Sequence, residues 1–306
     1  MKTRTKRGKR FLLCAGLLLG FAAASRADIL YVANSGINTI EKFTSGGAGS
    51  LFASSGLIDP YGLAFDSAGN LYAANVGNNT IEKFTPGGVG SVFASTGLNQ
   101  PTGLAFDSAG NLYAANDGNN TIEKFTPGGA GSLFASSGLS GPFGLAFDSA
   151  GNLYAANVGN NIIEKFTPGG VGSVFASTGL SAPIGLAFDS AGNLYAANDG
   201  NNTIEKFTPG GAGSLFASSG LSGPFGLAFD SAGNLYAANL NDNTIEKFTP
   251  GGVGSVFASS GLNEPAFLAF TDDAGVPLPL PPTPEPASAL LLLGSATALL
   301  ARRRRL

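Results

Sequence analysis

The sequence predicts an all-β fold, a six-bladed β-propeller of four-stranded antiparallel blades, on three observations. A unit of 41 residues occurs six times, each unit holds four short runs of strand-forming residues, and the first and last units are cut at complementary points. One proline and one tyrosine mark each unit. The markers are Pro60, Pro101, Pro142, Pro183, Pro224 and Pro265, and Tyr31, Tyr72, Tyr113, Tyr154, Tyr195 and Tyr236.

Four strands are predicted within each unit. In the unit that starts at Pro101 they are residues 103–107, 111–116, 121–126 and 132–136, all rich in Leu, Phe, Tyr and Ile. The residues between them combine Gly, Asn and Pro, which suits tight reversals. Four strands in about 40 residues is the spacing of a propeller blade, and neighbouring blades cover both of its faces. This explains why the runs are apolar on both sides.

The two ends of the repeat predict how the ring closes. The first unit begins at its second strand, residues 29–34, and the last unit stops after its first strand, residues 267–270. Together they complete the sixth blade and bring the total to 24 strands. We therefore expect the C-terminal strand to join the N-terminal blade and to cover its free edge.

The residue inventory restricts the chemistry. The chain has no histidine, and its one cysteine, Cys14, lies in the leader. Nucleophile systems that need His, and zinc sites, are therefore not expected. Carboxylates and oxygen-ligand metals remain, so we expect no cofactor, with Ca²⁺ as the open alternative and no metal ligand assigned.

Three groups of acidic residues recur or vary along the repeat. Asp66, Asp107, Asp148, Asp189 and Asp230 each begin an Asp-Ser-Ala-Gly-Asn reversal and are predicted to cap that turn. Glutamates that precede a lysine on the third strand are predicted to form ion pairs on the flank of the ring; they are Glu82, Glu123, Glu164, Glu205 and Glu246. Asp117, Asp199 and Asp242 break the repeat in loops on the face of the blade connections. For them, calcium or sugar binding stands against solvated turns.

The residue after each marker proline varies and is expected to border the central channel. Tyr61, Phe143 and Phe225 place an aromatic ring there on alternate blades. Because sugar rings stack on aromatic faces, these residues with Asp117, Asp199 and Asp242 are the predicted ligand site. The alternative is that they are core. No catalytic residue is assigned, because near-identical blades present near-identical groups.

Charge argues against nucleic acid as a partner. Seven of the 17 Lys and Arg precede Asp28 and four follow Ala301, which leaves six Lys against 20 Asp and Glu, a net charge of −14. Such a body repels phosphate backbones. We expect a monomer.

The termini read as targeting segments. Residues 1–27 have a basic start, an apolar stretch and small residues at their end, as in a signal peptide. The propeller is assigned to 28–273, a Pro-rich spacer to 274–286, a short transmembrane segment to 287–301 and an Arg-rich cytoplasmic tail to 302–306. The tail's sorting residues are Pro284, Glu285, Pro286, Arg302, Arg303, Arg304 and Arg305.

Two resemblances follow from these motifs. The segment from Pro101 to Gly129 resembles the NHL repeat in its Pro-x-Gly start and in its Asp-x-x-Gly-Asn and Gly-Asn-Asn turns. This resemblance implies a six-bladed propeller of the TolB-like type. The C-terminal order of Pro-Glu-Pro, apolar segment and arginines resembles the PEP-CTERM sorting signal. That resemblance implies a Gram-negative bacterium, an exosortase as partner during sorting, a transient inner-membrane anchor and a place at the cell surface or outside the cell.

The function expected from the sequence is an exported, non-catalytic binding or scaffolding module at the cell surface or in extracellular matrix. Matrix polysaccharide or a surface protein is the expected partner. The alternative is a metal-dependent lactonase or lyase with its site on the channel face of the propeller.

Overall fold

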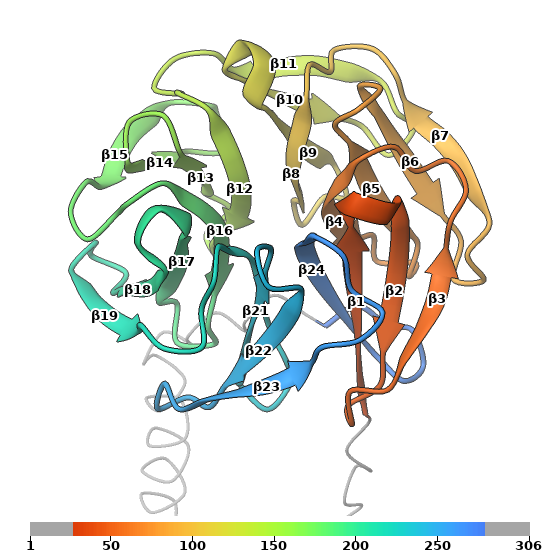
Figure 1. The fold of residues 1–306 in the computed structure, drawn as a ribbon. Helices are drawn as coiled ribbons and strands as arrows, with labels where there is room; N and C mark the ends of the chain where they lie inside the picture. The colour runs from red at the N-terminus through yellow and green to blue at the C-terminus, as the bar shows by residue number, and fades with distance from the viewer. Residues whose placement is uncertain (1–26, 279–306) are drawn as a thin grey trace, which may run out of the picture.

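The structure is a computed structural model that describes residues 27–278. Nearly all of the predicted targeting residues, 1–26 and 279–306, lie outside this range, so their assignments stay predictions. Between residues 27 and 278, no helix has the length and apolar character that crossing a membrane requires. Six four-stranded antiparallel sheets surround a central axis, which confirms the predicted six-bladed propeller (Figure 1).

We number the blades from the N-terminus and give the strands from the axis outward. Blade 1 is β24 (Pro265–Asp272), β1 (Asp28–Asn34), β2 (Thr39–Phe43) and β3 (Gly49–Ala53); blade 2 is β4 (Pro60–Phe65), β5 (Leu71–Asn75), β6 (Thr80–Phe84) and β7 (Gly90–Ala94); blade 3 is β8 (Pro101–Phe106), β9 (Leu112–Asn116), β10 (Thr121–Phe125) and β11 (Gly131–Ala135).

The other three blades repeat this order. Blade 4 is β12 (Pro142–Phe147), β13 (Leu153–Asn157), β14 (Ile162–Phe166) and β15 (Gly172–Ala176); blade 5 is β16 (Pro183–Phe188), β17 (Leu194–Asn198), β18 (Thr203–Phe207) and β19 (Gly213–Ala217); blade 6 is β20 (Pro224–Phe229), β21 (Leu235–Asn239), β22 (Thr244–Phe248) and β23 (Gly254–Ala258). Short 3₁₀ turns follow the second strand in alternate blades: η1 (Ser35–Ile37), η2 (Asp117–Asn119) and η3 (Asp199–Asn201).

Ring closure follows the prediction. β24 pairs with β1 in antiparallel register, with Leu30 opposite Phe270 and Val32 opposite Leu268. In Figure 1 the blue β24 lies beside the red β1, so the two ends of the repeat meet in one sheet. The pairing supplies the inner strand that blade 1 lacks and removes an exposed sheet edge.

Each inner strand leaves its ladder just after the marker proline. In blade 3, Pro101 pairs with Asn116 and Leu104 with Ala114, but the two residues between them are unpaired. At the second of these, Gly103, an added Cβ would lie 2.1 Å from the backbone oxygen of Phe143 in the next blade. Glycine is therefore required here, because the inner strands of adjacent blades touch backbone to backbone. In blade 1 this position holds Phe267 instead.

Aromatic rings fill the space between blades. Tyr113 lies edge-on to Phe134 at 4.9 Å and to Phe147 of blade 4 at 5.0 Å. Phe134 in turn contacts Phe166 of blade 4 at 6.1 Å. Such edge-to-face pairs are a favoured aromatic geometry and add to the energy of burial. The same arrangement recurs around the ring, so copying of the unit reproduced the interface between blades.

Candidate functional site

The predicted aromatic residues of the channel mouth come together on the axis. Tyr61 lies 5.4 Å from Phe225 and 6.4 Å from Phe143, and Phe143 lies 5.7 Å from Phe225, measured between ring centroids. Phe267 joins them, 5.6 Å from Phe225. Phe225 and Phe267 are buried, while Tyr61 and Phe143 keep partial exposure. The cluster thus closes the channel and presents part of Tyr61 and Phe143 at its mouth.

Among the residues that precede the marker prolines, the acidic ones lie in one half of the mouth. The residue before each marker proline lies at the rim, and its identity differs between blades. Blades 1 to 3 carry polar side chains there, whereas blades 4 to 6 carry small ones. In blade order the six are Glu264, Asp59, Gln100, Gly141, Ala182 and Gly223. The sixfold sameness of the ring is therefore broken most strongly at the point where a ligand would meet it.

An asparagine of the preceding blade holds each of these rim residues. The backbone N–H of Asp59 donates to Asn38 Oδ1 at 2.6 Å, and that of Glu264 donates to Asn243 Oδ1 at 2.7 Å. Asp59 and Glu264 adopt left-handed backbone conformations, with φ of 52° and 48°. Such conformations are costly for residues other than Gly and Asn, and surrounding contacts must hold them. The asparagines supply one such contact at every blade junction.

The electrostatics of the mouth favour protonated groups. Burial raises the pKa of Asp59, and the nearby charge of Glu264 raises it further. Burial also raises the pKa of Asp117. Burial, together with the charges of Asp59, Glu264 and Asp117, raises the pKa of Tyr61 to about 12. Tyr61 and three carboxyls therefore share one electrostatic environment on one side of the mouth.

The three predicted loop aspartates have different surroundings. Asp117 begins η2, and its backbone N–H donates to Gln100 O at 3.2 Å. This contact places Asp117 on the face of the blade connections, beside the mouth. Asp199 begins the equivalent η3 in blade 5 and is exposed. Asp242 accepts a hydrogen bond from Thr244 Oγ1 at 2.8 Å and belongs to its own turn. Asp117 is thus the one of the three whose charge acts on Tyr61.

Sequence reasoning missed Asp59, Glu264 and Phe267. It examined the residue after each proline, whereas variation at the residue before the proline marks the acidic half of the mouth. Glu264 directly precedes Pro265 and so belongs to this column. Phe267 could have been found as the one replacement of glycine in its column.

The mouth does not fit a metal ion held by protein ligands alone. Among residues 27–278, no group of three or more His, Cys, Asp or Glu side chains is arranged to hold one. Calcium prefers six to eight oxygen ligands, several of them carboxylates. The donor set at the mouth falls short of this, so we derive no step through a metal.

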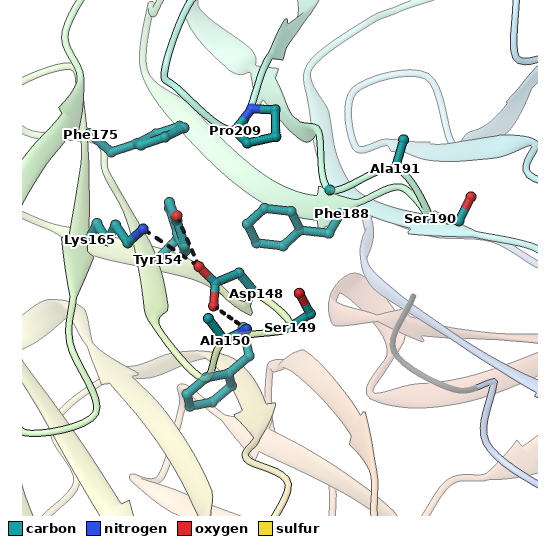
Figure 2. Close-up of a pocket in the computed structure, with 12 residues that line it drawn as sticks. Asp148, Ser149, Ala150, Tyr154, Lys165, Phe175, Phe188, Ser190, Ala191 and Pro209 are labelled. Atoms are coloured by element: carbon teal, nitrogen blue, oxygen red, sulfur yellow. Dashed lines mark hydrogen bonds and ion pairs between the residues drawn. The ribbon is translucent and has the colours of Figure 1, made fainter. Parts of the chain in front are cut away.

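The opposite face of the ring carries a repeated polar cluster between the blades. In blade 4, Asp148 Oδ2 accepts a hydrogen bond from Tyr154 Oη at 3.2 Å and lies 3.6 Å from Lys165 Nζ. Figure 2 shows this cluster in a cleft of about 210 Å³, with Phe175 and Phe188 also lining it. The same Asp-Tyr-Lys cluster occurs in blades 2 to 6.

This cluster confirms the turn prediction and corrects the ion-pair prediction. Asp148 Oδ1 accepts from the N–H of Ala150 at 3.0 Å, as expected of a turn cap. The lysine, however, pairs with this aspartate and not with the glutamate before it. Adjacent residues of a strand point to opposite faces, so Glu164 is buried on the other side of the sheet. The other four third-strand glutamates are buried in the same way.

Comparison with known protein families gives one match. The model of the virginiamycin B lyase family matches residues 28–267. A search of curated proteins found no match.

Solved structures share the fold at low identity. A nidogen/laminin complex contains a chain 22% identical with a TM-score of 0.72, covering 79% of this chain and 98% of that one. A virginiamycin B lyase from Staphylococcus aureus with quinupristin is 20% identical with a TM-score of 0.59, covering 80% and 82%. A gluconolactonase from Xanthomonas campestris is 18% identical with a TM-score of 0.60, covering 70% and 82%.

These findings correct the expectation that the protein is not an enzyme. The matching family is named for a lyase, and lyases and a lactonase are among the propellers of similar fold. The sequence argument against catalysis compared whole 41-residue units, which are nearly identical, and gave no weight to the few positions that differ. The blades differ where catalysis would take place, at the residues on both sides of the marker proline.

Proposed function

The chain belongs to the virginiamycin B lyase family, and we propose that it is an enzyme of lyase or lactonase type whose substrate binds at the channel mouth. One observation carries the proposal. Asp59, Glu264 and Asp117 act together on Tyr61 in one half of the mouth, whereas the residues before the marker prolines of the other half are small. Unlike groups around one open space are what catalysis requires.

The residues at the mouth favour acid–base chemistry by carboxylate and phenol. The crystallised Staphylococcus aureus relative is a variant described as catalytically inactive, in which one histidine is replaced by alanine. This chain has no histidine. Its base must therefore be another group, and we assign the carboxyl of Asp59, whose raised pKa makes it a stronger base than an ordinary aspartate.

In the proposed elimination, Asp59 takes a proton from the carbon next to a substrate carbonyl. The electrons of that C–H bond form a C=C bond as the neighbouring C–O bond breaks. Tyr61, which stays protonated at neutral pH, gives its phenolic proton to the leaving oxygen. The proton on Asp59 then restores the phenol. The exposed parts of Tyr61 and Phe143 would hold an apolar portion of the substrate.

Turnover by the purified full chain tests the proposal. Virginiamycin B and gluconolactone, the compounds for which the relatives are named, are the first substrates, and mass spectrometry reads the product. Elimination redistributes the atoms of the substrate, whereas hydrolysis adds one water. We expect Asp59→Asn and Tyr61→Phe each to lower the rate by about 100-fold. Asp242→Asn, in a turn of its own, is the matched control and should keep the rate.

Equal rates for the wild type and the Asp59→Asn, Tyr61→Phe double variant would contradict the proposal. A product with added water would assign the lactonase type, with Asp59 accepting the proton of the attacking water.

We further propose that this enzyme works outside the cytoplasm. Support comes from the leader-like residues 1–27 and from the PEP-CTERM-like tail with Pro284, Glu285 and Pro286. An exosortase would be its partner during sorting, and matrix polysaccharide or a surface protein its neighbour afterwards. Cell fractionation with and without the exosortase tests this. Protein of unchanged mass in the cytoplasm under both conditions would contradict it.

A further inference from the structure

The face opposite the mouth has an apolar hollow on its axis. Inner strands run from the mouth to this face and end there in an Ala-Phe pair, such as Ala146 and Phe147 at the end of β12. These pairs line a hollow of about 320 Å³, large enough for about ten water molecules. The lining side chains include Phe106, Asp107, Ala146, Phe147, Phe188 and Leu278. Because these side chains include a single carboxylate, that of Asp107, water in the hollow finds few hydrogen-bond partners.

The described chain ends at the edge of this hollow. After β24, the Asp272 carboxylate caps a turn by accepting the N–H groups of Ala274 and Val276 at 3.0 and 2.8 Å. Pro277 then bridges back to Thr271, and the Leu278 N–H donates to Phe270 O at 3.3 Å. These bonds direct the chain from the rim of blade 1 toward the axis.

Leu278, the last described residue, is already part of the surface in question. Its side chain packs with the apolar residues between blades 6 and 1. It also lines both the hollow and the adjoining cleft of about 470 Å³ between blades 5 and 6. Phe188, which Figure 2 shows beside the Asp148 cluster, lines both of these spaces as well. An apolar residue of the tail thus begins to fill the space that the blades leave open.

The next four residues have the chemistry to continue this packing. They are Pro279, Leu280, Pro281 and Pro282. Proline-rich segments favour the extended polyproline II form before they bind, and they dock on surfaces lined by aromatic rings. Three of the four lack a backbone N–H, so docking leaves few donors unpaired. At about 3.1 Å per residue they span about 12 Å, enough to cross a small hollow.

We propose that residues 279–282 occupy the hollow of their own propeller. Leu280 fills its centre against the alanines and phenylalanines, and the prolines lie across the aromatic walls. The chain then leaves the propeller on its axis, from the face opposite the mouth. A partner bound to the tail would therefore lie on the side of the propeller opposite the mouth. The proposal is independent of the chemistry assigned to the mouth.

A single tryptophan in the tail tests this occupancy in the full chain. The protein has no tryptophan, so Leu280→Trp makes the only one and leaves the described propeller unchanged. We expect emission at shorter wavelength and several-fold weaker quenching by acrylamide than for Asn119→Trp, an exposed turn position on the mouth face. Emission and quenching equal to those of Asn119→Trp would overturn the proposal.

A cysteine pair tests the location. In a Cys14→Ser background, Leu280→Cys is combined with Ala146→Cys or Ala105→Cys on the wall of the hollow, and with Asn119→Cys on the mouth face as the control. Oxidation should form an intramolecular disulfide in the wall pairs and several-fold less in the control. Equal yields in wall pairs and control would overturn the proposal. Disulfides between two molecules would assign the hollow to the tail of a second copy and would likewise overturn it.

Discussion

The two faces of the ring come from the same 41-residue unit but have diverged to different degrees. On the face opposite the mouth, the Asp-Tyr-Lys cluster keeps the same residues in blades 2 to 6. At the mouth, the residues before and after the marker proline differ in nearly every blade. Sameness on one face indicates a structural requirement shared by these five blades. Difference on the other face marks the place where one substrate could be recognised.

Loss of the closing strand would break both faces together. Deleting residues 266–270 removes Leu268 and Phe270, which are buried against blade 6, and reopens the edge of β1. We expect the melting temperature to fall by several degrees at least, because each lost kcal/mol lowers it by about 2–4 °C in a domain of this size. Calorimetry measures this. An unchanged melt would mean that β24 contributes nothing to the ring.

Substitutions of the rim asparagines can test the two halves of the mouth separately, because each half has an equivalent asparagine contact. Asn38→Gly removes the acceptor that holds Asp59, whereas Asn161→Gly removes the equivalent acceptor for Ala182. Glycine keeps the left-handed backbone, so both variants should lose about 1 kcal/mol of stability. Only Asn38→Gly should lower the turnover rate, by about ten- to hundredfold through displacement of Asp59. Similar rates in the two variants would show that the halves do not differ in function.

The inner strands connect the two faces, and their glycines are tested one at a time. Gly103→Ala places a methyl group 2.1 Å from the backbone oxygen of Phe143. We expect a loss of about 1–3 kcal/mol of stability from this overpacking. Gly128→Ala in the same blade is the control, because its nearest neighbour is Thr126 Oγ1 at 3.9 Å. Denaturant unfolding of both variants should show a loss in the first alone.

The repeated cluster should affect stability without affecting the mouth. Asp148→Asn weakens the bonds to Lys165 and Tyr154, and we expect a loss of about 1 kcal/mol in chemical denaturation. The turnover rate should stay at the wild-type value. A lower rate would contradict the division of roles between the two faces.

Carboxyls of the two faces should titrate on opposite sides of their ordinary range. Burial raises the pKa of Asp59, and Glu264 adds to this. Burial alone would also raise the pKa of Asp148, but hydrogen bonds from Asn152 and the charge of Lys165 outweigh it and lower the pKa. Carbon-detected NMR titration should show Asp148 ionising below about pH 4 and Asp59 above it. Coincident titration would contradict this contrast.

These shifts have opposite effects on stability. The folded-state pKa of Asp148 is depressed, so its stabilisation is present above the unfolded pKa of about 3.9 and is lost as the pH falls through the folded value. The folded-state pKa of Asp59 is raised, so its contribution is present at low pH and is lost as the pH rises through the folded value. The Asp148→Asn variant should therefore lose less stability in acid than the wild type.

The sequence predicts the ring well because each blade repeats the same local signals. The Asp-Ser-Ala-Gly-Asn turns, the marker prolines and the offset ends are local or periodic, and the structure confirms them. Side-chain partners across strands are not visible in the same way. Lys165 was paired with its neighbour Glu164, although the alternation of a strand sends the two to opposite faces. Asp59 and Glu264 were missed because their left-handed backbone, which brings them to the mouth, depends on an asparagine in another blade.

Pairing of β24 with β1 also governs the order of events during synthesis. The first three strands of the chain cannot complete their blade until the last strand of the propeller, more than 200 residues later, has left the ribosome. Until then the edge of β1 stays available to other strands, and contacts so distant in sequence form slowly. A nascent chain is thus kept from completing its ring before the whole propeller has been synthesised.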